Sequence, residues 1–152
     1  MRRAAPPCLV LIAVLALPAL ARANDASLEH ALHGYESKLT TDISYLADFS
    51  APSRGGASGA LSRISGTQKD LSAAYRAASG QQGSSSTGRS GRSLVLSALS
   101  EANTAAGDAK ASADAARSGN SSAARSDANK ERGVIDQAIP RFEQGGKDLH
   151  LF

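Results

Sequence analysis

Residues 93–142 carry the sequence SLVLSALSEANTAAGDAKASADAARSGNSSAARSDANKERGVIDQAIPRF, which decides the fold. Large apolar residues lie at its two ends, and alanine recurs at helical spacing between them. Gly119 and the polar residues after it can end one helix and start another. Folding back at this turn places Leu94–Leu99 beside Val134–Phe142, and alanine beside alanine. The stretch therefore predicts an antiparallel, alanine-rich hairpin.

The turn and a proline set the bounds expected for this hairpin, with helices over 93–118 and 121–139. Glu131 is the polar member of the apolar seam in the second helix. Proline inside a helix removes a backbone hydrogen bond and clashes with the preceding turn, so Pro140 should kink or end the helix. Residues 145–152 would then form a short, loosely held tail.

Two further helices are expected before the hairpin. Over residues 25–50 the large apolar residues step by three or four, and the segment ends before Pro52. Over residues 57–79 the steps alternate strictly between four and three, as in helices that cross at a shallow angle. The Gly/Ser-rich residues 80–92 are interpreted as a flexible linker. Together these elements predict an all-α, up-down-up-down four-helix bundle.

Residues 1–23 predict a secretory signal peptide that is cleaved on export. Arg2 lies in a positively charged amino-terminal region, Leu9–Leu17 form a short apolar run, and Ala21–Ala23 supply a small-residue cleavage site. The run is shorter than the roughly 18 residues that a membrane anchor needs, so cleavage is favoured over stable membrane insertion. Residues 24–152 would form a single helical domain that is secreted, periplasmic or otherwise extracytoplasmic.

Charge argues against a nucleic-acid-binding protein. The chain has 17 Lys and Arg residues against 14 Asp and Glu residues, for a formal net charge of +3. Three of the arginines lie in the leader, so residues 24–152 are balanced and their basic residues are scattered among acidic ones. Cys8 is the only cysteine and also lies in the leader. We therefore expect neither a disulfide nor a cysteine-based site after cleavage.

No motif predicts catalysis. Gly83–Ser90 (GSSSTGRS) is close to a phosphate-binding loop, but the buried strand and parallel sheet that such a loop requires are not expected here. No serine nucleophile elbow and no acid/base pair of side chains can be nominated. We expect a protein that is not an enzyme and carries no cofactor.

Three histidines suggest a hypothetical metal site. His30 and His33 have the i, i+3 spacing that can aim two imidazoles at one ion. In an up-down bundle the end of the last helix returns to the same pole, which could bring His150 near them. The alternative is that all three are ordinary, solvated surface residues.

An exposed aromatic edge is the preferred candidate for an interaction surface. Tyr45 falls beside the apolar stripe of its helix, and Phe49 follows one turn later. We expect their rings to form an exposed edge. The alternative is simple packing beneath the loop at residues 51–59.

These features favour a noncatalytic, exported helical bundle that binds another macromolecule, such as a protein partner, at the cell envelope or outside the cell. The alternative is a carrier that holds a small apolar ligand or a metal within the bundle or at one pole, because an alanine-rich core fills space poorly. Alanine seams could equally serve a dimer.

Overall fold

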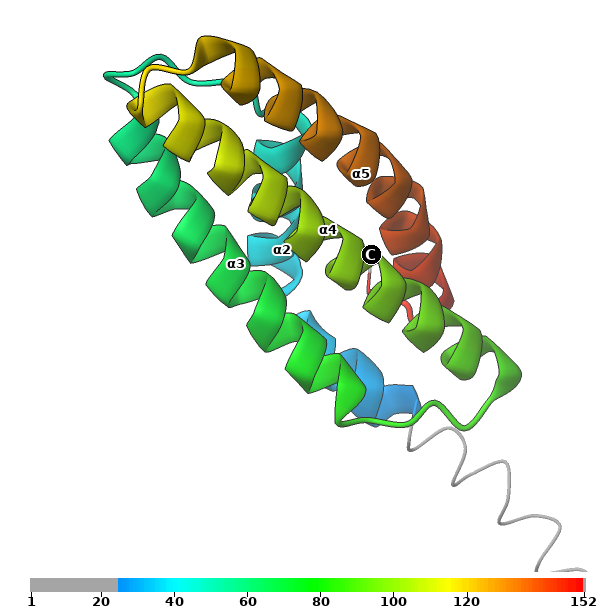
Figure 1. Cartoon of the computed structure of the whole chain (residues 1–152). Coiled ribbons are helices and arrows are strands. Elements are labelled where there is room, and N and C mark those ends of the chain that lie inside the picture. The colour runs from blue at the N-terminus through cyan, green and yellow to red at the C-terminus, as the bar shows by residue number, and fades with distance from the viewer. Residues whose placement is uncertain (1–24, 152) are drawn as a thin grey trace, which may run out of the picture.

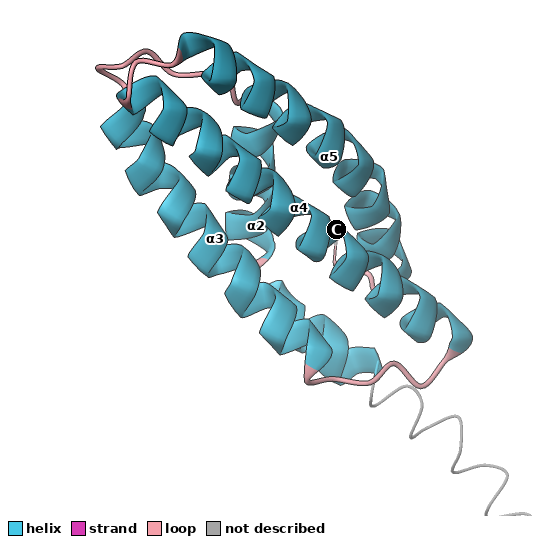
Figure 2. Cartoon of the chain, in the orientation of Figure 1, coloured by secondary structure: helices cyan, strands magenta, loops and turns pink. Residues whose placement is uncertain are grey.

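The computed structural model describes residues 25–151 and is all-helical over that range (Figures 1 and 2). A helix over residues 25–33 is followed by α2 (Glu36–Ala47), α3 (Ala57–Ser79), α4 (Ser86–Arg117) and α5 (Ser121–Asp148). No strand occurs among these residues, so the expected all-α class is confirmed. The signal peptide expected over residues 1–23 and the start at Asn24 lie outside the described residues.

The segment expected to form one helix over residues 25–50 is instead divided. A turn at Gly34 and Tyr35 separates the helix over 25–33 from α2, and the N–H of Tyr35 donates to the carbonyl of Leu32 at 2.8 Å. Glycine is a poor helix former, which explains why the break falls here. The prediction of one continuous helix was wrong. Because of the break, the direction of α2 is not fixed by that of the helix over residues 25–33.

The prediction of a flexible linker over residues 80–92 was wrong in its second half, because α4 begins at Ser86. The Ser85 hydroxyl caps this helix by accepting the N–H of Gly88 at 2.8 Å. The Asp25 carboxylate accepts the N–H of Ser84 at 2.8 Å, which ties the loop to the first helix. Serine-rich sequence here supplies a helix cap as well as a linker.

The sequence predicts that the last helix kinks or ends near residue 139. It does not end there, because α5 continues through Pro140 to Asp148. The residues after α5 are packed against the protein and do not form a loose tail, since the Leu149 and Leu151 side chains are only 3% and 6% exposed. Pro140 itself is exposed, whereas Phe142 and other residues around it are buried. Packing of the buried face therefore outweighs the backbone hydrogen bond that proline cannot make.

Helices α4 and α5 lie side by side along most of their length (Figure 1). Gly119 makes the turn between them with a positive φ of 86°, which glycine adopts without strain. Near this turn the Ser112 hydroxyl donates to the carbonyl of Ala124 at 2.7 Å. At the far end Gly145 packs on Gly91, where a Cβ on Gly145 would lie 2.9 Å from the Gly91 carbonyl oxygen. These contacts are consistent with the expected antiparallel hairpin.

The remaining helices cover this pair with larger side chains. Helix α3 packs on α4, and α2 contacts α3, α4 and α5. These helices and the one over 25–33 contribute the largest fully buried aliphatic residues outside the α4–α5 pair: Leu28, Leu32, Leu39, Leu46, Ile64 and Leu71. Among the described helices, none combines the length and the apolar character needed to span a membrane.

Two glycines of α5 provide a matched test of this packing. Gly145→Ala should destabilise the fold by about 1–3 kcal/mol, because the new Cβ would push α4 and α5 apart. Gly133→Ala meets nothing within 4 Å and should stabilise it by about 0.5–1 kcal/mol, the ordinary helical cost of glycine. Urea unfolding of both variants measures these changes. Equal effects at the two positions would contradict the close approach.

Candidate functional site

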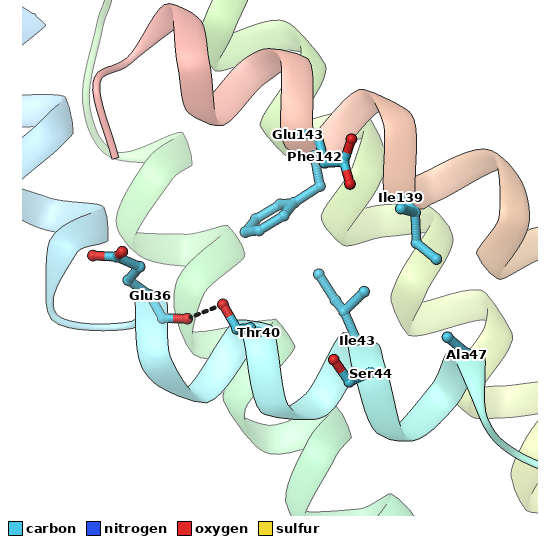
Figure 3. A pocket seen from close by; sticks show the side chains of 8 residues that line it. All are labelled: Glu36, Thr40, Ile43, Ser44, Ala47, Ile139, Phe142 and Glu143. Carbon is cyan, nitrogen blue, oxygen red and sulfur yellow. Dashed lines mark hydrogen bonds between the residues drawn. The ribbon is translucent and has the colours of Figure 1, made fainter. Parts of the chain in front are cut away.

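A groove between α2 and α5 has a cavity volume of about 400 Å³ (Figure 3). It is open to solvent on one side. The residues that line it are Glu36, Thr40, Ile43, Ser44 and Ala47 from α2 and Ile139, Phe142 and Glu143 from α5.

The floor of the groove is apolar. Ile43 and Phe142 are 8% and 6% exposed, and in Figure 3 they point toward one another from the two helices. Ile139 points from α5 toward the end of α2 (Figure 3). The Thr40 hydroxyl on the α2 side donates to the backbone carbonyl of Glu36 at 3.0 Å, so it is already satisfied. An apolar side chain is the group that this floor would accept best.

Helical spacing explains how α2 supplies one wall. The lining positions 36, 40, 43 or 44, and 47 are three or four residues apart, which places them on one face. Leu39 and Leu46 point into the core, where both are no more than 1% exposed. Small side chains, Ser44 and Ala47, occupy the groove face of α2 and leave space opposite Ile139.

The rim of the groove is acidic. Glu36 is partly exposed and lies 3.2 Å from the Nδ1 atom of His33. Glu143 is exposed on the α5 side. The residues that line the groove include neither lysine nor arginine. An occupant would therefore meet apolar contacts at the floor and negative charge at the edge.

A buried polar cluster fixes α2 against α3. Asp42 is 2% exposed, accepts a hydrogen bond from the Thr67 hydroxyl at 2.8 Å, and pairs with Arg63 at 3.0 Å. The Arg63 guanidinium also lies 5.2 Å from the ring centroid of Tyr45. Removing one partner would leave a buried charge unpaired, which is costly. This cluster holds the α2 wall of the groove in place.

Tyr45 and Phe49 do not form the exposed edge expected from the sequence. Their ring centroids are 6.1 Å apart with an interplanar angle of 70°, an edge-to-face contact. However, Phe49 is only 5% exposed and Tyr45 is half-buried. Burial raises the pKa of Tyr45, and the charge of Arg63 partly opposes this shift. The expectation of an exposed Phe49 was wrong, because its ring packs into the core.

Glu131 is a second buried carboxyl group, and it lacks the partners that Asp42 has. It is 0% exposed, and neither of its oxygens accepts a hydrogen bond from the described residues. Burial raises its pKa to about 7, with smaller upward contributions from Asp136 and Asp108 and an opposing one from Arg132. The group is therefore close to half-protonated at neutral pH.

The structure does not bring the three histidines together. His30, His33 and His150 are all exposed. His150 lines a separate hollow with Asp25, Glu29 and other residues, and neither His30 nor His33 lines it. Within residues 25–151, no group of three or more His, Cys, Asp or Glu side chains is placed to hold a metal ion.

The segment that is close to a phosphate-binding loop holds an anion from its own chain. The backbone N–H groups of Ser84 and Ser85 donate to the Asp25 carboxylate at the start of α4. A Cβ on Gly88 would overlap that carboxylate, so glycine is required there. The Ser85 side-chain hydrogen bond is the main cause that lowers the pKa of Asp25, and these backbone donors add to it. The segment acts as a helix cap.

Sequence reasoning missed the groove and the Asp42 cluster. The apolar spacing over residues 25–50 and the apolar stretch Val134–Phe142 predict the two helices that wall the groove. Nothing in the pattern shows that α2 and α5 leave space between them. Asp42 beside Ile43 was a usable signal, since a carboxylate next to a core position needs a partner. Comparison of the chain with models of protein families, with curated proteins and with solved structures gives no match.

Glu131 makes a pH-dependent stability testable. The carboxyl group ionises at its ordinary value of 4.5 when the chain is unfolded and at about 7 when it is folded. Between these values the folded state holds more protons, so the free energy of unfolding falls as pH rises and levels off above about 7. The loss attributable to Glu131 should be on the order of 3 kcal/mol. Urea unfolding from pH 4 to pH 9, with pH steps of about 0.5, measures it.

Glu131→Gln should flatten this part of the profile and raise stability at pH 8. Glu143→Gln is the matched control, because that side chain is exposed on the same helix. It should leave the profile unchanged. Parallel profiles for the wild-type protein and Glu131→Gln would show that the buried carboxyl does not control the stability.

Proposed function

We propose that this chain is an exported, noncatalytic four-helix-bundle protein that binds another protein at the cell envelope or outside the cell. Its α4 and α5 would form the alanine-rich antiparallel hairpin of that bundle. The observation that carries the proposal is the apolar groove between α2 and α5. A one-sided groove walled by two helices offers contact area to a protein side chain while the rest of the partner stays outside.

The chemistry of the groove supports binding. Its floor is formed by Ile43, Ile139 and Phe142, whose contribution to affinity is burial of apolar surface. Its ionisable lining groups are the carboxylates of Glu36 and Glu143 at the rim. These features favour recognition of a protein partner through the shape of the apolar floor and the charge of the rim.

A carrier of a small apolar ligand is the second candidate. The groove volume of about 400 Å³ falls within the range of about 300–1,000 Å³ found for ligand sites. Such sites usually enclose most of the ligand surface, whereas this groove is open along one side. The opening favours a protein partner over an enclosed small molecule.

Export of the protein should leave Asn24 as the first residue, because the Ala21–Ala23 stretch follows the apolar run of the leader. Amino-terminal sequencing of the protein recovered outside the cytoplasm measures this. Recovery of a membrane-associated species that still begins with Met1 would replace export with membrane anchoring.

A photo-cross-linking amino acid at Ser44 tests the groove as a protein-binding site. Ser44 lines the groove, and Ser65 is an exposed serine of α3 that does not. With extracytoplasmic fractions of the source cells, position 44 should give a defined protein adduct and position 65 should not. Ile139→Asp, added to the position 44 variant, should remove the adduct because a carboxylate on the floor is costly to bury.

Thermal unfolding of the Ile139→Asp variant shows whether it is still folded, which separates loss of the groove from loss of the fold. The purified partner should then raise the unfolding temperature of the wild-type protein. Equal adducts at the two positions, or none at either, would contradict the proposal. An adduct with a small molecule alone would favour the carrier instead.

A further inference from the structure

We propose that the partner of the α2–α5 groove presents an amphipathic helix whose apolar face is flanked by lysine or arginine. This inference rests on the proposed function and names the chemistry of the partner. It combines the shape of the groove, its apolar floor and its acidic rim.

The length of the groove matches a short helix. The lining residues of α2 run from Glu36 to Ala47, which is about 16 Å at 1.5 Å per residue. This length corresponds to three helical turns on a partner. The α5 wall is shorter, because its lining residues run only from Ile139 to Glu143, about one helical turn. A helix in a groove contacts it through residues at i, i+3 or i+4, and i+7, and the length of the α2 wall suits that spacing.

The floor selects apolar residues for the inner face of the partner helix. Ile43, Ile139 and Phe142 offer no hydrogen-bonding side-chain group to an occupant. A polar side chain placed on them would lose its water without gaining a partner. Leucine, isoleucine or phenylalanine at the inner positions would instead bury apolar surface on both sides.

The rim selects positive charge for the flanks. Glu143 is exposed, and no ion pair within the described residues joins it to a lysine or arginine. The Glu36 carboxylate lies 3.2 Å from the Nδ1 atom of His33, and no ion pair within the described residues joins it to a lysine or arginine. Each exposed pair with a partner cation would contribute little affinity, but the two carboxylates together would discriminate between basic and acidic partners.

Other occupants fit this chemistry less well. Anionic lipid surfaces and nucleic acids attract basic surfaces, whereas the groove presents carboxylates at its rim. A second copy of the chain that docked through the same groove would place acidic rims against one another. A basic amphipathic helix is the partner whose apolar face matches the floor of the groove and whose positive charges match its acidic rim.

Two labelled 18-residue peptides test the inference on the exported protein. One is a leucine/lysine helix and the other a leucine/glutamate helix with the same apolar face. By fluorescence anisotropy, the lysine peptide should bind at least tenfold more tightly at low salt. The difference should narrow as salt is added, because added ions screen exposed charges.

Paired variants test whether the tighter binding of the lysine peptide depends on the groove. Glu36→Gln combined with Glu143→Gln should remove most of the tenfold difference, whereas Glu29→Gln combined with Asp127→Asn changes the net charge equally and should preserve it. Ser44→Trp should weaken the lysine peptide at least tenfold by filling the groove. Ser65→Trp on α3 should have no effect. Thermal unfolding of each variant confirms that it is folded.

The outcomes separate this inference from the proposed function. Equal binding of both peptides, or binding that Ser44→Trp does not weaken, would overturn the basic-helix inference. If neither peptide binds while Ser44 still cross-links a protein, the inference fails and the proposed function stands. If neither peptide binds and Ser44 yields no protein adduct, both fail.

Discussion

The close approach of α4 and α5 is the constraint on which the other helices depend. It is possible because the facing residues are small: Gly91 meets Gly145 at one end, and Ser112 meets Ala124 at the other. A buried alanine contributes less free energy than a buried leucine, so no single contact in this seam is decisive. The stability of the pair comes from its extent, since α4 has 32 residues and α5 has 28. Many close van der Waals contacts add up over that length.

The packing of α2 follows a different rule, with large side chains and a buried polar cluster. Leu39 and Leu46 reach the core, and Asp42 is held by Thr67 and Arg63. The polar contacts require specific geometry, because a buried carboxylate without donors costs several kcal/mol. They therefore fix the position of α2 more narrowly than apolar contacts alone would. This defined position is what allows a groove to persist beside it.

Glu131 is a carboxyl group that is buried without a hydrogen-bond donor among the described residues. Glu131 lies on the buried face of α5 between Ala128 and Ile135, whose side chains carry no hydrogen-bond donor. Asp42 finds two, on α3, whereas Glu131 finds none within the described residues. Its pKa rises to about 7 because burial favours the neutral form. Two carboxyl groups of similar burial thus differ in whether donors from a neighbouring helix reach them.

The sequence predicted features that depend on local periodicity and failed on features that depend on packing. The all-α class, the span of α3 and the turn at Gly119 could be predicted from helical spacing and turn residues. The passage of α5 through Pro140 could not, because the packing that offsets the lost hydrogen bond comes from α4. The burial of Phe49 and the groove were equally inaccessible, since both depend on where α2 lies relative to helices distant in the sequence.

The groove results from the meeting of these two kinds of packing. Helices α4 and α5 are held close by small residues, whereas α2 begins after the break at Gly34 and is positioned by its polar contacts to α3 together with its packing on α4 and α5. The face that α2 turns toward α5 carries Ser44 and Ala47, which are too small to reach Ile139. A leucine at either position would fill the space and bury more apolar surface. Packing alone would therefore favour closing the groove, and the small side chains at these two positions are what keep it open.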